Sequence, residues 1–393
     1  MSSLKYWIWL ASIDGIGPVT ALRLLEHFGT PENVYAANAH DYRAVDGVGP
    51  ADTRRLTDKN TDCASKILAD CERTGCRIIT YNDALYPDRL RNIYDPPFVL
   101  YYRGTMPLFD DEPVVAIVGT RSSTPYGTSA AEKTAYRLAK HGFIVSTGLA
   151  RGIDSAAAWG ALRGGGRVAG VIGSGTDIVY PAENRGLFEE VAGSGAIISQ
   201  YPPGTPAHPT HFPARNRIIS GLSLGVAVIE APKRSGALIT AARALEQGRD
   251  VFALPGNVDA RNNEGSNALM REGAIPMLSA DDIISEYAAL FPDKIIFSDD
   301  DDSPAAEYEV RRTVKKGIDN QSGVDYIGVE KIPDGLDGDE LIVAKAVAGA
   351  ALLTDDIIAV TGLPAQRVSP ALTMLEINGH ASRNANGKWK LEN

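Results

Sequence analysis

Two apolar runs of this 393-residue chain each end in a short glycine turn that carries an arginine. The turn Gly119-Thr120-Arg121-Ser122 follows Val114 to Val118, and the turn Gly148 to Asp154 follows Phe143 to Thr147. A helix that begins beyond such a turn presents free N–H groups, and these groups attract anions, phosphate above all. We therefore expect phosphate to bind at the turns, with Arg121 beside it.

The segment from Phe212 to Arg217 combines residues that suit unpaired nucleic acid. Arg215 and Arg217 supply planar forks that bind phosphate, and the amide of Asn216 can meet a base edge. Phe212 can stack on an unpaired base, an interaction of about 1 to 3 kcal/mol that is open only to single strands. A structural alternative stays open, in which Arg217 pairs with an internal carboxylate and Phe212 belongs to the core.

An alternation of strands and helices from Pro113 to about Tyr287 must position these residues. The apolar pattern predicts strands near 114–118, 143–147, 167–172, 195–199, 225–230 and 251–254, and helices near 126–140, 153–163, 184–192, 214–221, 236–247 and 264–272. This pattern predicts right-handed βαβ units in a Rossmann-like, doubly wound, mostly parallel α/β sheet. Ligands of such sheets bind at the carboxyl ends of the strands, so both glycine turns should open on one edge.

Residues 1–75 contain an internal repeat. Ile13-Asp14-Gly15-Ile16-Gly17-Pro18 returns 32 positions later as Val45-Asp46-Gly47-Val48-Gly49-Pro50, and a helical pattern follows each copy. This is a helix-hairpin-helix pattern, whose free amides can hold a DNA phosphate without reading sequence. The alternative is a SAM-like domain in which both hairpins only pack helices.

The acidic residues of the chain are unevenly distributed. Residues 291–340 hold 14 acidic and 6 basic side chains, so the other 343 residues carry 35 acidic against 33 basic and can form basic clusters despite the net charge of -10. We expect residues 291–340 to be a mobile linker. It would join a core with an extended lead-in, residues 76–290, to a C-terminal domain, residues 341–393.

The C-terminal domain has the pattern of a winged helix. Helices are expected over 341–348, 355–360 and 365–377, and a β-wing over 379–391. Such modules often read DNA through the second helix of the turn, but here that helix offers only Arg367 as a cation. DNA contact and protein contact both remain open for this domain.

Composition argues against a metal, a membrane span and a secreted protein. Cys63, Cys71 and Cys76 fit neither a zinc ribbon nor a redox CxxC motif, and we interpret them as reduced thiols in the cytoplasm. The N-terminus does not fit a signal peptide, and no apolar run approaches the roughly 20 residues that span a bilayer. We expect a soluble protein without a cofactor.

Enzyme motifs known on related sheets are incomplete in this chain. A dinucleotide site requires GxGxxG, but the first turn has one glycine, and Gly173-Ser174-Gly175 is followed by Ile178 where the third glycine belongs. No GxSxG elbow occurs, and the six histidines show no partnering pattern. We predict no catalytic residues.

Six ordered motifs resemble those of the DNA-processing protein DprA (Smf) family, densely from Leu85 to Ile284. They are Gly119-Thr120-Arg121, Gly148-Leu149-Ala150-Arg151-Gly152-Ile153-Asp154, Gly173-Ser174-Gly175 with Tyr180-Pro181-Ala182-Glu183-Asn184, Phe212-Pro213-Ala214-Arg215-Asn216-Arg217-Ile218-Ile219-Ser220-Gly221, Ser235-Gly236-Ala237-Leu238-Ile239-Thr240-Ala241 and Leu254-Pro255-Gly256-Asn257. The resemblance implies a single-stranded-DNA-binding protein that protects incoming DNA and loads the RecA recombinase in natural transformation. A homodimer through the core would set two such sites in line.

The motifs and the resemblance together give one expected nucleic-acid site. Its residues are Gly119, Thr120, Arg121, Ser122, Gly148, Arg151, Gly173, Ser174, Gly175, Phe212, Arg215, Asn216, Arg217, Ser235, Gly236 and Thr240. The rival interpretation is a nucleotide-binding or nucleoside-monophosphate-cleaving enzyme that resembles the LOG-type phosphoribohydrolases. The glycine and threonine of their motif are present, but no acid follows closely, because Glu246 comes almost two helical turns after Thr240.

Overall fold

The computed structural model describes residues 3–296, 336, 338–347, 353–361, 363–383 and 388–391. The chain divides into two compact units, Met1–Val314 and Lys315–Asn393. Most of the expected acidic linker, residues 297–335 and 337, lies outside the described residues. Within the described parts of both units, no helix is long and apolar enough to cross a membrane.

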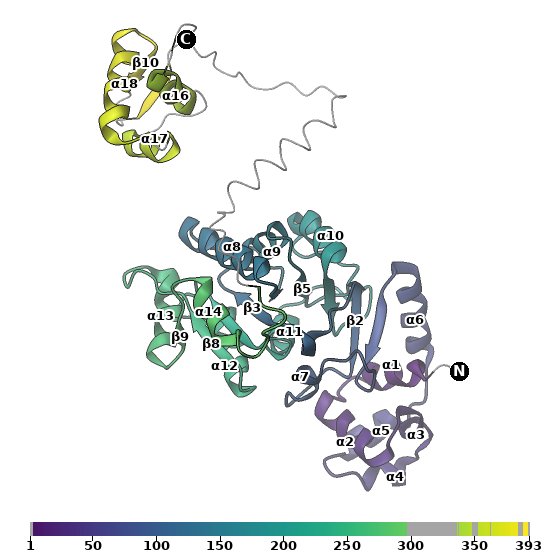
Figure 1. Cartoon of the computed structure of the whole chain (residues 1–393). Helices are drawn as coiled ribbons and strands as arrows, with labels where there is room; N and C mark the ends of the chain where they lie inside the picture. Colours follow the sequence, from purple (N-terminus) through teal and green to yellow (C-terminus); the bar gives the residue numbers. More distant parts are fainter. Residues whose placement is uncertain are drawn as a thin grey trace. The chain divides into compact units, whose positions relative to one another are not determined.

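A nine-stranded sheet forms the centre of the first unit (Figure 1). Its strands are β1 Arg77–Thr80, β2 Val99–Gly104, β3 Val114–Val118, β4 Ile144–Thr147, β5 Val168–Val171, β6 Ala196–Ser199, β7 Gly225–Val228, β8 Asp250–Ala253 and β9 Ile275–Pro276. The strand order is β1-β2-β6-β5-β4-β3-β7-β8-β9. The seven strands from β6 to β9 are parallel, and β2 runs antiparallel to both of its neighbours, β1 and β6. The expected Rossmann-like, mostly parallel sheet is confirmed.

Helices cover both faces of this sheet because its central strands are apolar on both sides. In β3, Val115 and Ile117 face one layer, while Val114, Ala116 and Val118 face the other. The first layer contains α8 Pro125–Lys140, α9 Ile153–Arg163, α10 Arg185–Ser194 and α14 Ala280–Tyr287. The second contains α7 Asp88–Arg91, α11 His211–Gly221, α12 Gly236–Glu246 and α13 Glu264–Arg271. Short 3-10 turns lie at Phe109–Asp111, Ala182–Asn184 and Arg261–Asn263.

Helix α11 begins three residues earlier than the sequence pattern predicted, at His211 instead of residue 214. Pro213 does not prevent this start, because a proline in the first turn of a helix removes no intrahelical hydrogen bond. As a result, Phe212 and Arg215 are three residues apart on the helix and lie on the same helical face. Both side chains line the same cavity.

The N-terminal helices form a bundle that packs on the antiparallel edge of the sheet. They are α1 Leu4–Ser12, α2 Pro18–Phe28, α3 Pro31–Ala36, α4 Ala39–Arg43, α5 Pro50–Thr57 and α6 Asp62–Thr74. Their core includes Phe98, Val99 and Tyr101 from the lead-in and β2. The bundle therefore shares a hydrophobic core with the sheet edge.

The sequence repeat relates the two hairpins of the bundle. The glycine turn of each hairpin is in contact with an arginine from the helix that follows the other hairpin. Gly15 and Gly47 both have a positive φ, close to 80°, which favours glycine. The Arg55 guanidinium packs on Gly15, and the Arg23 guanidinium packs on Gly47. Since 32 positions separate Gly15 from Gly47, and also Arg23 from Arg55, the repeat extends to this reciprocal contact.

The second unit has the expected elements of a winged helix. They are α16 Gly338–Val347, α17 Thr354–Thr361, α18 Ala365–Ile377 and a hairpin of β10 Ala381–Arg383 with β11 Trp389–Leu391. Trp389 closes the core and donates from its indole Nε1 to Thr354 Oγ1 at 3.2 Å. Arg367, the one cation expected on the recognition helix, forms an ion pair with Asp339. This pairing lowers the positive charge that α18 can offer to DNA.

Candidate nucleic-acid interface

A cavity of about 510 Å³ opens where the loops after β3 and β7 meet. The chain places β4, β5 and β6 on one side of β3 and β7, β8 and β9 on the other, so this is the point where the strand order reverses. Ligands of open parallel sheets bind at such a switch point. Nine of the expected site residues line the cavity: Gly119, Thr120, Arg121, Phe212, Arg215, Asn216, Ser235, Gly236 and Thr240.

The rim of the cavity carries a stacked cation and two aromatic rings. Arg121 is exposed and its guanidinium lies 4.9 Å from the centre of the Phe212 ring. Tyr180 contributes a second ring, whose centre lies 5.6 Å from that of Phe212. Phe212 is half-buried and lines the cavity, so the alternative that it belongs to the core is not supported.

The first glycine turn does not offer the free N–H groups that the sequence suggested. Thr120 donates its N–H to the main-chain oxygen of Glu230, and Thr124 donates its N–H to the Glu230 carboxylate at 2.9 Å. Glu230 is buried at the end of β7, so its carboxylate occupies the anion position at the start of α8. The phosphate cradle expected at this turn is thus filled from within the protein.

The start of α12 provides an open helix N-terminus in its place. Ser235 caps the helix by accepting from Ala237 N–H at 3.2 Å. A Cβ atom built on Gly236 would meet no atom within 4 Å, so the backbone is open to the cavity there. Arg234, which precedes the cap, is exposed and lines the cavity as well. This helix end attracts an anion through its N–H groups and dipole.

Arg217 points away from the cavity, which corrects the expectation that it meets a phosphate. Its Nε donates to Asp95 at 3.0 Å, and its Nη1 donates to Gln200 at 2.8 Å. Only 5% of the residue is exposed. Arg217 therefore pairs with an internal carboxylate, as the structural alternative in the sequence analysis stated. This ion pair connects α11 with the lead-in segment.

Arg215 lines the cavity from below and is almost fully buried, at 4% exposure. Its guanidinium packs on Gly148 and donates to the main-chain oxygen of Val171. Any side chain at position 148 would collide with this guanidinium. Burial lowers the pKa of Arg215 to about 10. Arg215 is still cationic at neutral pH and gives the cavity floor a positive charge.

Six other expected residues lie outside the cavity lining: Ser122, Gly148, Arg151, Gly173, Ser174 and Gly175. Arg151 is bidentate to Glu183, with Nη2 to Oε2 at 2.9 Å, so its charge is neutralised. A Cβ on Gly173 would lie 3.2 Å from the Phe212 ring, so this glycine gives the ring room. Ser174 donates from its hydroxyl to the main-chain oxygen of Ile178 in its own loop, and Gly175 donates its N–H to the main-chain oxygen of Thr205 in the loop after β6.

Three functional candidates were missed from sequence: Asp154, Tyr180 and Arg234 line the cavity. Asp154 is 7% exposed and accepts from Ala150 N–H at 3.4 Å. Burial raises the pKa of this carboxyl, and the Arg215 charge opposes the rise. All three stand within or next to the glycine and proline motifs. Their positions within or beside these motifs are the sequence signal that could have identified them.

Three family models match successive parts of the chain. A SAM-like Helix-hairpin-helix tandem matches residues 10–59, the DNA recombination-mediator protein A model matches residues 77–288, and the DprA winged helix domain matches residues 330–387. The chain belongs to the DprA (Smf) family.

Named DprA and Smf proteins are similar over long stretches. Protein Smf of Synechocystis sp. is 35% identical over 97% of both chains. DNA processing protein DprA of Streptococcus pneumoniae is 44% identical over 52% of this chain and 72% of its own. The X-ray structure of the latter protein superposes with a TM-score of 0.63 at 34% identity, covering 76% of this chain and 100% of that one.

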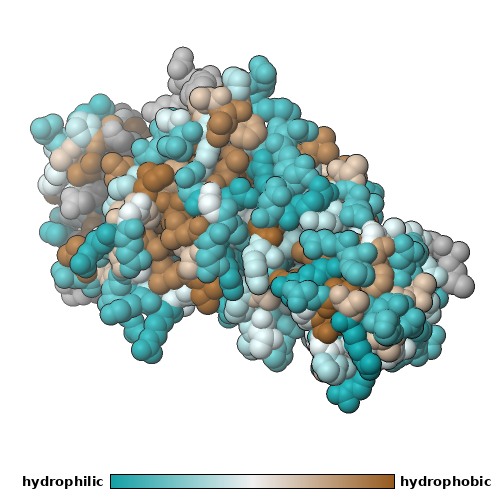
Figure 2. All heavy atoms as spheres, turned by 90° about the horizontal axis from the view of Figure 1, so that it is seen from below, coloured by the Kyte–Doolittle hydropathy of each residue, from teal (hydrophilic) through white to brown (hydrophobic). Residues whose placement is uncertain are grey.

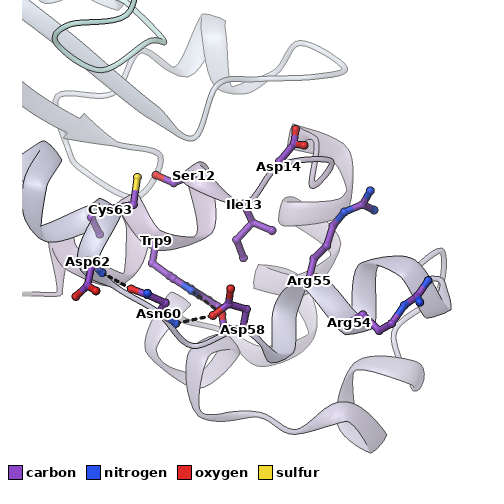
Figure 3. A pocket seen from close by; sticks show the side chains of 11 residues that line it. Trp9, Ser12, Ile13, Asp14, Arg54, Arg55, Asp58, Asn60, Asp62 and Cys63 are labelled. Atoms are coloured by element: carbon purple, nitrogen blue, oxygen red, sulfur yellow. Dashed lines mark hydrogen bonds between the residues drawn. The ribbon is translucent and has the colours of Figure 1, made fainter.

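This DprA family member has a second cavity, of about 540 Å³, in its helical bundle (Figure 3). Its walls mix charges of both signs, with Arg54 and Arg55 against Asp14, Asp58 and Asp62. Arg54 and Arg55 extend away from the indole of Trp9, which donates to Asp58. Because three aspartates stand against two arginines there, the bundle cavity is less suited to a polyanion than the sheet-edge cavity.

Proposed function

We propose that this protein binds single-stranded DNA in the sheet-edge cavity and serves recombination by delivering that DNA to RecA. Its family membership gives it a DNA-processing role in recombination. The observation that carries the proposal is the joint presence of exposed cations, Arg121 and Arg234, and aromatic rings, Phe212 and Tyr180, around one cavity.

Each group has a counterpart in an unpaired nucleotide. Arg121, Arg234 and the N-terminus of α12 bind phosphate through charge and N–H donors. Phe212 and Tyr180 offer ring faces for a base, and stacking of this kind tolerates any base. A duplex keeps its bases stacked on each other, so it can satisfy the cations but not the rings.

The site proposal covers all the expected residues in two roles. Those that line the cavity contact DNA, while Gly148, Arg151, Gly173, Ser174, Gly175, Ser122 and Arg217 hold the contacting loops in place. We place the protein in the cytoplasm and include no catalytic turnover. Binding to RecA and protection of incoming DNA are part of the same proposal and rest on the family relationship alone.

We also propose a homodimer through the core. Helix α12 exposes Ile239 and Leu245 together with Ala242, which are one turn apart on one face. This helix lies on the lower side of the sheet in Figure 1, and the view from below in Figure 2 shows hydrophobic residues gathered among hydrophilic ones. Ile239 also lines the cavity, so a second copy seated on α12 would bring two DNA sites close together.

Fluorescence anisotropy with a labelled oligo(dT) and a matched duplex tests the DNA proposal. We expect the full-length protein to bind the single strand more tightly than the duplex at the same salt concentration. Equal affinity for both would indicate binding by charge alone, and the ring contacts would then have no role.

A further inference from the structure

The floor of the sheet-edge cavity holds a donor without a partner. Arg215 Nε is buried and has no hydrogen-bond partner among the described residues. A buried donor left unpaired costs roughly 1 to 3 kcal/mol, and such groups in native proteins are usually satisfied by another molecule. The Arg215 side chain lines the cavity, so an acceptor atom of a bound ligand can pair with this donor.

An acceptor lies beside this donor. Asp154 also lines the cavity, and its carboxylate accepts the N–H of Ala150 at 3.4 Å. An ionised carboxylate has about four lone-pair sites, so lone pairs remain for a ligand. Gly148 is common to the two groups, because the Arg215 guanidinium packs on it and its N–H lowers the pKa of the Asp154 carboxyl. The floor thus presents a carboxylate and a guanidinium side by side.

The rim determines which part of a nucleotide can reach this floor. Phosphate is drawn to Arg121 and Arg234, both exposed at the mouth, and a base face is drawn to Phe212 and Tyr180. With these parts engaged above, the edge of the base is the portion left to point inward. Edges of unstacked bases are the part that proteins read by hydrogen bonds.

We propose that Asp154 and Arg215 read the Watson–Crick edge of one inserted base and favour guanine. This inference rests on the proposed binding of single-stranded DNA and adds a base preference to it. Guanine presents two neighbouring donors, N1–H and the N2 amino group, which match the two oxygens of a carboxylate. Its O6 is an acceptor for the guanidinium.

The other bases match the floor less well. Adenine and cytosine each place a ring nitrogen acceptor beside their amino group, and this lone pair would face the carboxylate. Thymine has one N–H between two carbonyl oxygens, so it also brings acceptors toward Asp154. Only guanine satisfies both floor groups without placing two acceptors against each other.

The test uses oligo(dT) strands that carry one central guanine, one central hypoxanthine or no replacement. A single guanine per strand cannot form a quadruplex, and hypoxanthine keeps the purine ring but lacks the N2 amino group. We expect the guanine strand to bind about tenfold more tightly than the hypoxanthine strand, the effect of one hydrogen bond to a charged group. Equal affinities would overturn the base preference.

Protein variants separate this inference from the proposed function. Asp154→Asn should abolish the difference in affinity between the guanine strand and the hypoxanthine strand. Arg121→Ala should weaken all three strands by the same factor and leave the difference in place. Because the chemical change lies in the DNA, the comparison on the wild-type protein holds even if Asp154→Asn folds poorly. Failure of every strand to bind would instead contradict the proposed function.

Discussion

At the residue scale, the arginines of this protein divide by the charges around them. Arg121 is exposed, and among the described residues it forms no ion pair. Arg217 is buried against Asp95, and Arg151 is paired with Glu183. A phosphate can replace water at Arg121 without breaking an internal ion pair. The exposed arginines are therefore the ones that should determine the affinity for DNA.

Replacing Arg121 by alanine should weaken binding to every single strand alike, because a phosphate contact is lost. The plot of log affinity against log salt should flatten by about 0.7 for that contact. Phe212→Leu should lower affinity with little change in the slope, since stacking releases no counterions. Salt titrations of anisotropy measure both slopes. If Arg121→Ala binds with wild-type affinity and slope while folded, the site has been misplaced.

Asp154 should make stability depend on pH in a defined direction. Burial raises the pKa of its carboxyl in the folded protein above the unfolded value. Asp154 therefore makes its full contribution to the free energy of unfolding when the pH is below the pKa of the unfolded state. This contribution is lost as the pH rises through the pKa of the folded state. Urea unfolding at pH 4, 5.5 and 7 should show the wild type losing stability relative to Asp154→Asn as pH rises. Asp259→Asn, which changes an exposed aspartate, serves as the control variant, and the opposite trend would contradict the assignment.

At the element scale, Glu230 connects the end of β7 with the start of α8. Its carboxylate accepts from the N–H and the hydroxyl of Thr124, and a Cβ on Gly127 would collide with it. The turn that carries Arg121 is fixed between these two elements. The internal carboxylate thus sets the position of a residue proposed to bind DNA.

Glu230→Gln should lower the free energy of unfolding by about 1 to 2 kcal/mol, because the N-terminus of α8 loses its negative cap. Binding to oligo(dT) should also weaken as the Arg121 turn loosens. Chemical denaturation and anisotropy give the two values. Glu264→Gln, at the exposed first turn of α13, is the matched control and should change stability by less than about 0.5 kcal/mol. Equal effects of both variants would show that the connection has no special role.

At the scale of the whole molecule, the sheet-edge cavity resembles a nucleotide-cleaving site only in part. Glu246 lies on α12, forms an ion pair with Arg243 and is absent from the cavity lining. Asp154 is present there, but it accepts N–H groups of its own turn. The fold therefore supplies a carboxylate that the motif after Thr240 lacks, but this carboxylate lies on the cavity floor beside Arg215.

We expect the purified protein to release no free base from nucleoside monophosphates. Hydrolysis requires a carboxylate at the ribosyl carbon, and the one in the cavity, Asp154, lies on the floor, where we place the edge of the base and not the ribose. Chromatography of reaction mixtures with all four monophosphates is the measurement. Release that disappears in Asp154→Asn would promote the enzyme interpretation, and release that persists would indicate a contaminant.

The proposed dimer can be tested on the exposed face of α12. Leu245→Arg should shift the protein from dimer to monomer in light scattering coupled to size exclusion, because a charge would be buried in an apolar contact. Leu85→Arg changes an exposed leucine of the lead-in and should leave the mass unchanged. A monomeric wild type would rule out the dimer, and a dimeric Leu245→Arg would place its interface elsewhere.

The sequence by itself determined the layers of the fold and nine of the residues that line the sheet-edge cavity. Strands such as β3 are continuous apolar runs, helices such as α12 have an apolar stripe and a cap, and both signals are local. For the same reason the motifs placed Arg121, Phe212 and Gly236 at one sheet edge. The six ordered motifs also led to the correct family.

Only the tertiary structure decided which charges are available. Glu230 reaches the α8 N-terminus from 106 residues away, and Asp95 reaches Arg217 from 122 residues away. Asp154 meets Arg215 in the same way, from a different loop. Pairing and burial depend on neighbours that are distant in sequence, and an arginine motif reads the same whether its charge is free or satisfied. That distinction separates the residues that can bind DNA from those that hold them in place.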